Sequence, residues 1–172
     1  TDRCNLRCTY CMPAEVIFRQ REQLLDYAEI ARVAAVAASL GIRTIRLTGG
    51  EPLVRRDLDQ LVRLLVDLPG IEEVTLTTNG ILLAEQAGPL AAAGLTRLNV
   101  SLDALSEEAF VRIARRNGLA AVLAGLAAAQ AAGFHSIRIN AVSIRGLTEA
   151  EIVPLADFAR KAGFHLRFIE FM

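Results

Sequence analysis

Hydrophobic and polar residues alternate in five short stretches, which are interleaved with longer stretches of helical periodicity. The alternating stretches predict five β-strands, at residues 42–47, 74–78, 97–101, 137–142 and 166–170. The longer stretches predict six helices, at residues 27–40, 58–67, 82–93, 107–115, 119–132 and 149–162. Strands that alternate with helices through short loops run parallel, so the pattern predicts an α/β fold.

Residues at the predicted helix ends agree with these boundaries. Asp26 lies three positions before Glu29, as in a capping box. Asp57 and Thr148 precede two further helices, and we expect them to cap those helices. Glycines follow four helices in the position that favours a left-handed backbone, at Gly41, Gly94, Gly133 and Gly163.

The repeat spacing predicts a partial (β/α)6 TIM-like barrel. A complete eight-stranded barrel takes roughly 250 residues, and this chain has 172. The chain opens at Thr1, three residues before its first cysteine, and stops at Met172 after an apolar run. We therefore expect residues 1–172 to form one domain that is truncated at both ends, with its first strand lying mostly before Thr1.

Polar residues occur at alternate positions of every predicted strand; such positions share one face of the strand, and we call them one parity. The polar residues of this parity are Thr44, Arg46, Thr75, Thr77, Asn99, Ser101, Arg138, Asn140 and Arg167. Their apolar neighbours should face the helices, so the polar set should line the barrel interior. Burying these groups without partners costs free energy, and a polar ligand would satisfy them. The alternative is a solvated face of an open sheet.

Three of these inward residues, Arg46, Arg138 and Arg167, are arginines. Convergent guanidinium groups favour an anion, and phosphate is the usual one. Ion pairing with inward carboxylates is the alternative. Glu51 and Glu170 are the few such carboxylates that we expect there, so an anionic ligand is the better interpretation.

The three cysteines of the chain, Cys4, Cys8 and Cys11, have the spacing C-x3-C-x2-C. Closely spaced thiolates suit an iron–sulfur cluster or zinc. Three ligands are one fewer than usually close such a site, so an iron–sulfur cluster held this way keeps one iron open. One alternative is a zinc site with a fourth ligand from His135 or His165. Another is a redox role for the cysteines. The odd cysteine count indicates a reducing compartment, and we expect a cytoplasmic protein.

Polar residues also follow the predicted strands, at the edge where a barrel carries its active site. Gly49 and Gly50 would let a ligand approach the backbone, and Glu51 could accept hydrogen bonds from an amine. Asn79 and Asp103 end two other strands. Each could line the site or serve as a turn or cap residue.

Composition excludes several classes of partner. The formal net charge is zero, so the sequence has no basic footprint for nucleic acid. The most apolar stretch, residues 119–134, is shorter than the ~20 residues that span a bilayer. We expect binding to neither nucleic acid nor membrane.

Five segments together resemble the radical S-adenosylmethionine enzymes and, within them, the GTP 3′,8-cyclase family of molybdenum-cofactor synthesis. They are TDRCNLRCTYCMP (1–13), IRLTGGEPLVRRDL (45–58), LTTNG (76–80), LNVSLDA (98–104) and RFIEFM (167–172). The resemblance runs the length of the chain.

The resemblance implies cofactors and their ligands. Cys4, Cys8 and Cys11 would ligate a catalytic 4Fe-4S cluster whose open iron chelates S-adenosylmethionine. Further S-adenosylmethionine contacts are implied for Tyr10, Gly49, Gly50, Glu51, Ser101 and Met172. Contacts to GTP are implied for Arg46, Thr77, Arg138 and Arg167.

The resemblance also implies a reaction. An electron from an external donor would cleave S-adenosylmethionine to a 5′-deoxyadenosyl radical, which abstracts hydrogen from C3′ of GTP. The C3′ radical then attacks C8 and gives (8S)-3′,8-cyclo-7,8-dihydroguanosine 5′-triphosphate, the product of a lyase reaction. The resemblance allows a homodimer.

The chain departs from the family in four respects. The family usually has lysine where this chain has Arg138, and a glycine after Pro13 that is absent here. The family's second three-cysteine cluster, expected only in the full-length protein, and its first strand have no counterpart in these residues. We therefore predict that the 172 residues alone do not complete cyclisation.

Two other classes remain open at this point. One is a different radical S-adenosylmethionine enzyme, such as a peptide-modifying one. The other is a non-enzymatic zinc-binding module.

Overall fold

The computed structural model of the chain describes all 172 residues and contains one five-stranded sheet. Its strands are β1 (Thr44–Leu47), β2 (Glu73–Thr78), β3 (Arg97–Ser101), β4 (Ile137–Ser143) and β5 (His165–Glu170). They lie in chain order and every neighbouring pair is parallel. Sequential parallel strands are the arrangement of an unclosed β/α barrel, so the predicted partial barrel is confirmed, with five of the six expected strands present.

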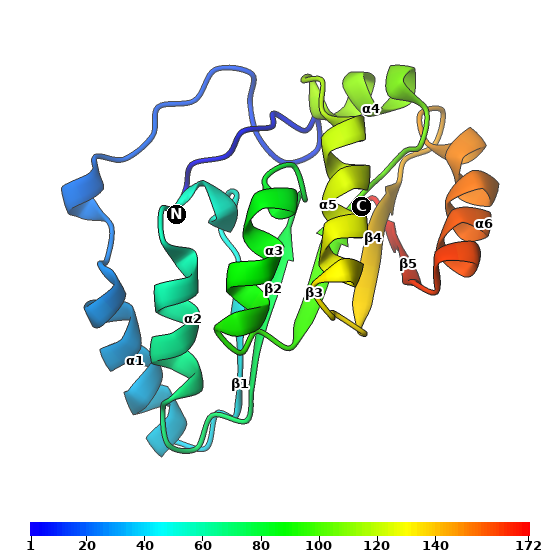
Figure 1. The fold of residues 1–172 in the computed structure, drawn as a ribbon. Coiled ribbons are helices and arrows are strands. Elements are labelled where there is room, and N and C mark those ends of the chain that lie inside the picture. Colours follow the sequence, from blue (N-terminus) through cyan, green and yellow to red (C-terminus); the bar gives the residue numbers. More distant parts are fainter.

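Six helices connect the strands: α1 (Tyr27–Ser39), α2 (Leu58–Val66), α3 (Leu83–Ala92), α4 (Glu107–Ala114), α5 (Leu119–Ala131) and α6 (Ile152–Ala162). Figure 1 shows α2, α3 and α5 packed in front of the strands, with α6 beside β5. Every predicted helix is present. The last one begins with a separate 3-10 turn, η3 (Glu149–Glu151). None of the helices has both the length and the apolarity needed to cross a membrane.

The predicted helix caps are confirmed at α1 and wrong at two other helices. The Glu29 N–H donates to Asp26 Oδ1 at 2.7 Å, and the Asp26 N–H donates to Glu29 Oε2 at 2.8 Å. Asp57 instead has a left-handed backbone (φ 56°) and caps nothing. The Thr148 hydroxyl accepts from Ile144 N–H at 2.8 Å, after β4. Cap residues have several possible partners, and the tertiary neighbours select one.

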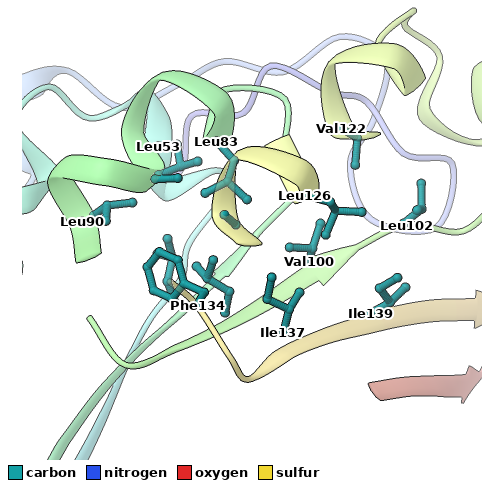
Figure 2. Close-up of a cluster of buried hydrophobic side chains, with 14 of the residues drawn as sticks. Leu53, Leu83, Leu90, Val100, Leu102, Val122, Leu126, Phe134, Ile137 and Ile139 are labelled. Carbon is teal, nitrogen blue, oxygen red and sulfur yellow. The ribbon is translucent and has the colours of Figure 1, made fainter. Parts of the chain in front are cut away.

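A single hydrophobic cluster lies between the sheet and the helices. It takes Val100 and Ile139 from the strands and Leu83, Val122 and Leu126 from α3 and α5, all at most 1% exposed. Figure 2 shows these side chains meeting between the two layers. Because the apolar parity of the strands faces this core, the polar parity faces the opposite, inner side of the sheet.

Candidate functional site

The three cysteines lie in an extended segment, residues 1–13, that we call the cysteine loop. Figure 1 shows it as the dark blue ribbon that runs across the upper edge of the sheet toward α4. This edge holds the carboxyl ends of the strands, since the loop bonds to Gly50 after β1 and to Asn79 after β2. In parallel β/α folds, binding sites form at this edge.

Gly49 and Gly50 let the cysteine loop lie directly against the turn that follows β1. The Gly50 N–H donates to Thr1 O at 2.7 Å, and the Glu51 N–H donates to Arg3 O at 2.7 Å. A Cβ on Gly50 would lie 2.4 Å from Arg3 O, and one on Gly49 would lie 2.5 Å from Thr1 O. We expected a ligand to approach the backbone N–H groups of this turn. Those of Gly50 and Glu51 are instead occupied by the cysteine loop.

Glu51 is 1% exposed, and its carboxylate already has three hydrogen-bond donors. Oε1 accepts from Leu53 N–H at 2.9 Å and from the Thr78 hydroxyl at 2.7 Å, and Oε2 accepts from Asn79 N–H at 2.7 Å. Burial raises the pKa of Glu51, and these hydrogen bonds oppose the shift. The carboxylate that we expected to accept from an amine therefore already has protein donors on both oxygens. Glu51 joins the turn after β1 to the end of β2.

Asn79 connects the end of β2 to the cysteine loop. Its Nδ2 donates to Asn5 Oδ1 at 2.7 Å and lies 3.9 Å from Cys4 Sγ, while its Oδ1 accepts from Ile81 N–H at 3.1 Å. The last bond is the local turn that the sequence predicted for this residue. Asn79 therefore combines a turn role with a contact to the cysteine loop.

The other half of the loop lies on the C-terminal end of α4. Here the Arg7 N–H donates to Ala114 O at 3.0 Å, and the Thr9 N–H donates to Ile113 O at 2.9 Å. These carbonyls are among the last of α4 and lack partners within the helix. The loop therefore completes the hydrogen bonding of α4 while the helix fixes the position of the loop.

Asp103 links the cysteine loop to β4. Its Oδ2 accepts from the Tyr10 hydroxyl at 2.7 Å, and its Oδ1 accepts from Val142 N–H at 2.8 Å. The alternative role as a helix cap is wrong, because Ser106 caps α4 by accepting from Ala109 N–H at 3.4 Å. Burial raises the pKa of Asp103.

The cysteines have the donor chemistry that an iron–sulfur cluster requires. Burial raises the pKa of the Cys4 thiol and raises that of Cys8 to about 12, and the neighbouring cysteines add to both shifts. A thiol gives up its proton when it binds a metal. The Leu6 N–H points at Cys4 Sγ at 3.4 Å, an N–H···S contact of the kind that tunes iron–sulfur sites.

No group of three or more His, Cys, Asp or Glu side chains converges in the structure as a metal site. Three soft donors on one loop nevertheless fit an iron–sulfur cluster in number and type. The proposed histidine ligands for zinc lie elsewhere. His165 opens β5 opposite Arg138, and His135 precedes β4, so both are at the amino end of the strands.

The inner face of the sheet carries the predicted arginines. Arg46 lies opposite Thr75, Arg138 opposite Asn99, and Arg167 opposite Asn140. Burial lowers the pKa of Arg138, and nearby Arg167, Arg97 and Arg46 lower it further. The guanidinium groups are thus close enough to repel one another, as expected of a face that binds an anion.

Two inner-face residues were not predicted from the sequence. Arg97 lies opposite Thr75 and is a fourth inward arginine, and it pairs with Glu73. Both have the same parity as their polar strand neighbours, a signal that could have identified them. Glu170, which we expected inward, has the parity of Leu166 and belongs to the outer side of β5.

The remaining predicted residues have different outcomes. Thr77 Oγ1 accepts from Asn99 Nδ2 at 3.5 Å on the inner face. Ser101 lines a cavity of about 30 Å³ together with Cys8, Tyr10 and Asp103, so the structure brings it to the cysteine loop. Met172 follows β5 with a fully exposed side chain, and no contact places it at the loop.

Residues 1–159 match the Radical SAM superfamily. The chain belongs to this superfamily, whose cofactors, a 4Fe-4S cluster and S-adenosylmethionine, agree with the cysteine loop described above.

Similar curated proteins carry a narrower name. The GTP 3′,8-cyclase of Rhodopirellula baltica is 52% identical over 174 residues, covering 100% of this chain and 48% of that protein. The GTP 3′,8-cyclase of Acidothermus cellulolyticus is 52% identical over 178 residues, covering 100% of this chain and 49% of that protein. This chain thus spans about half the length of the relatives that it matches.

Solved structures share the fold at low sequence identity. Streptococcus suis SuiB bound to S-adenosylmethionine has a TM-score of 0.79 at 20% identity, covering 99% of this chain and 37% of that one. Native anSMEcpe with bound AdoMet has a TM-score of 0.78 at 17% identity, covering 100% of this chain and 50% of that one. These similarities establish the barrel architecture.

Proposed function

We propose that this chain carries the cluster-binding and GTP-binding part of a GTP 3′,8-cyclase. The observation that carries the proposal is the charge of the inner face. Four arginines, Arg46, Arg97, Arg138 and Arg167, lie there with one paired carboxylate, below the edge that holds the cysteine loop. The identity of 52% to proteins named GTP 3′,8-cyclase supports the same conclusion.

In this proposal Cys4, Cys8 and Cys11 hold a 4Fe-4S cluster. When bound, the cluster and S-adenosylmethionine supply a radical that removes a hydrogen atom from the substrate. The Leu6 N–H and the Asn79 amide stabilise the Cys4 sulfur, at 3.4 and 3.9 Å.

S-adenosylmethionine lies, in this proposal, along the edge formed by Gly49, Gly50, Tyr10 and Ser101, with Met172 as a further predicted contact. Glu51 acts indirectly, because its carboxylate is already satisfied by Leu53, Thr78 and Asn79. Its role is to hold the turn after β1 rigid against the end of β2.

GTP occupies the inner face, with its phosphates at the arginines. A guanidinium group can bind phosphate through two parallel hydrogen bonds, and Arg138 would do so where a lysine would act as a point charge. Thr77 adds a hydroxyl donor in the same row of the sheet as Arg138, because both lie opposite Asn99. Arg97 is partly neutralised by Glu73, so Arg46, Arg138 and Arg167 are the principal phosphate ligands. An external electron donor and a homodimer belong to the same proposal.

Anaerobic reconstitution with iron and sulfide tests the cofactor part of the proposal. We expect an electron paramagnetic resonance spectrum of a reduced 4Fe-4S cluster that changes when S-adenosylmethionine is added. A chain that retains zinc and takes up no iron would contradict the proposal and support a zinc module.

Equilibrium dialysis tests the nucleotide part. Arg138→Ala should weaken GTP binding by about tenfold, the worth of a charge-assisted hydrogen bond. Arg63→Ala is the matched control, because Arg63 is an exposed arginine on α2 that pairs with Asp59. Equal affinities of the two variants would contradict the assignment of the inner face to GTP.

A further inference from the structure

The buried carboxylate of Asp103 has no assigned role in the binding of cluster, S-adenosylmethionine or GTP. Asp103 is 8% exposed and lies two positions after the last residue of β3. A buried carboxylate is costly unless its oxygens have hydrogen-bond donors. Both oxygens of Asp103 have one, from Tyr10 and from Val142. No arginine or lysine bonds to it, so this carboxylate does not serve an ion pair.

The partner of Asp103 in the cysteine loop lies between two cysteines. Tyr10 is two positions after Cys8 and directly before Cys11. Its hydroxyl donates to Asp103 Oδ2 at 2.7 Å across 93 positions of sequence.

The other hydrogen bonds of the loop next to Tyr10 come from its backbone. The Thr9 N–H bonds to Ile113 O at 2.9 Å, and the Cys11 N–H bonds to Cys8 O at 3.0 Å. The Tyr10–Asp103 bond is the side-chain hydrogen bond that joins this part of the loop to the end of β3, and the side chains of Cys8 and Tyr10 also pack against the hydrophobic core. It also fixes the loop relative to β4, because Asp103 Oδ1 is held by Val142 N–H.

We propose that Asp103 is a positioning residue that orients Tyr10, and through it the segment between Cys8 and Cys11, over the carboxyl ends of β3 and β4. The expected effect on S-adenosylmethionine binding rests on the proposed function. The Tyr10–Asp103 hydrogen bond itself does not depend on any cofactor. Ser101, a predicted S-adenosylmethionine contact, lines the same small cavity as Tyr10 and Asp103.

Amide hydrogen exchange of the cofactor-free chain tests the contact. Tyr10→Phe and Asp103→Ala should each speed exchange of the Thr9 amide by about tenfold, since the loop opens more readily. The double variant should exchange no faster than the faster single variant. If the two increases in exchange rate multiply in the double variant, Tyr10 and Asp103 act independently and the proposal is wrong.

A conservative variant separates positioning from general stability. Asp103→Asn keeps an oxygen for Val142 N–H and offers its amide to the Tyr10 oxygen, so we expect it to stay within about threefold of the unmodified chain. Tyr27→Phe is the matched control, because Tyr27 donates to Arg56 O at 2.7 Å on the surface of α1. Two outcomes would contradict the positioning role of Asp103. In one, the Thr9 amide exchanges as fast in Asp103→Asn as in Asp103→Ala. In the other, it exchanges as fast in Tyr27→Phe as in Tyr10→Phe.

The reconstituted chain tests the consequence. Tyr10→Phe and Asp103→Ala should weaken S-adenosylmethionine binding by about tenfold, and Asp103→Asn should restore most of it. If the unmodified chain binds neither cluster nor S-adenosylmethionine, the proposed function fails. In that case the exchange experiment still decides whether Asp103 positions Tyr10.

Discussion

The edge that carries the cysteine loop and the inner face of the sheet use carboxylates in opposite ways. At the loop edge, Glu51 and Asp103 are buried, accept hydrogen bonds from backbone and hydroxyl groups, and have raised pKa values. On the inner face, Glu73 pairs with Arg97 and has a lowered pKa. The two carboxylates at the edge are therefore satisfied internally, whereas the inner face has more positive charge than its one carboxylate can neutralise.

This difference in hydrogen bonding and charge indicates that the loop edge is preorganised by protein contacts and that the inner face has charge available for a ligand. The carboxylates of Glu51 and Asp103 at the loop edge have donors within the protein, so changes to these two residues should chiefly lower stability. Three of the four arginines on the inner face lack a carboxylate partner in the structure. Changes at those arginines should chiefly lower affinity for an anion.

The largest expected effect is at Glu51. Glu51→Ala leaves the donors of Leu53, Thr78 and Asn79 unpaired in a buried site, and we expect a loss of about 3 kcal/mol in the free energy of unfolding. Urea denaturation measures it. Glu72→Ala is the control, because Glu72 makes an exposed ion pair with Arg43 and should change stability little. Equal losses for the two variants would remove the distinction between edge and surface carboxylates.

The next effect is at Gly50. Gly50→Ala places a methyl group 2.4 Å from Arg3 O, so the cysteine loop must move. We expect a loss of about 2 kcal/mol, with less iron bound after anaerobic reconstitution. Gly88→Ala in α3 is the control, since a Cβ there meets nothing within 4 Å, and it should stabilise the chain slightly. Full iron uptake by Gly50→Ala would show that the loop does not need this close approach.

A smaller effect on affinity is expected at the inner face. Arg46→Met removes one of the like charges near Arg138, and stability should therefore stay within about 0.5 kcal/mol of the unmodified chain. Inorganic triphosphate binding should fall by about tenfold, as measured by equilibrium dialysis. A variant that loses stability and keeps its affinity would reverse the roles that we assign to the two regions.

The smallest expected effect is on the pH dependence of stability, and its direction differs between the loop edge and the inner face. The Glu73 pKa lies below the ordinary 4.5, so its stabilising contribution is present above about pH 4.5 and is lost as the pH falls through the folded value. This contribution should be under about 1 kcal/mol, because the pair is partly exposed.

The Glu51 pKa lies above 4.5, so its contribution is fully present below that pH and is lost as the pH rises through the folded value. Denaturation of Glu73→Gln and Glu51→Gln between pH 3 and 7 should therefore change the pH dependence in opposite directions. Changes of the pH dependence in the same direction would contradict the pKa shifts assigned to Glu73 and Glu51.

Much of the barrel could be predicted from the sequence because periodicity is a local property. All five strands and six helices occur where alternation and helical spacing predicted them. The same parity rule located Arg46, Arg138 and Arg167 on the inner face. It would also have located Glu73 and Arg97 had it been applied to the first residues of β2 and β3.

The partners of polar side chains could not be predicted in this way. Glu51, Asp57, Asp103 and Thr148 each have several local roles open to them in sequence, and their neighbours in space selected one. Gly50 was predicted to admit a ligand, and the structure shows that it admits the cysteine loop. Such choices depend on contacts between residues far apart in the chain.

The sequence by itself determined the α/β architecture, the inward position of the arginines and the presence of three cysteine thiols on one segment. Periodicity and residue chemistry act within a few positions of the chain, and these features need nothing more. Only the tertiary structure decided that the Glu51 carboxylate joins the turn after β1 to the end of β2 and that the Asp103 carboxylate joins the cysteine loop to β4. A buried carboxylate is stable only where the fold supplies its donors, and Asp103 receives them from Tyr10 and Val142, on either side of it in sequence.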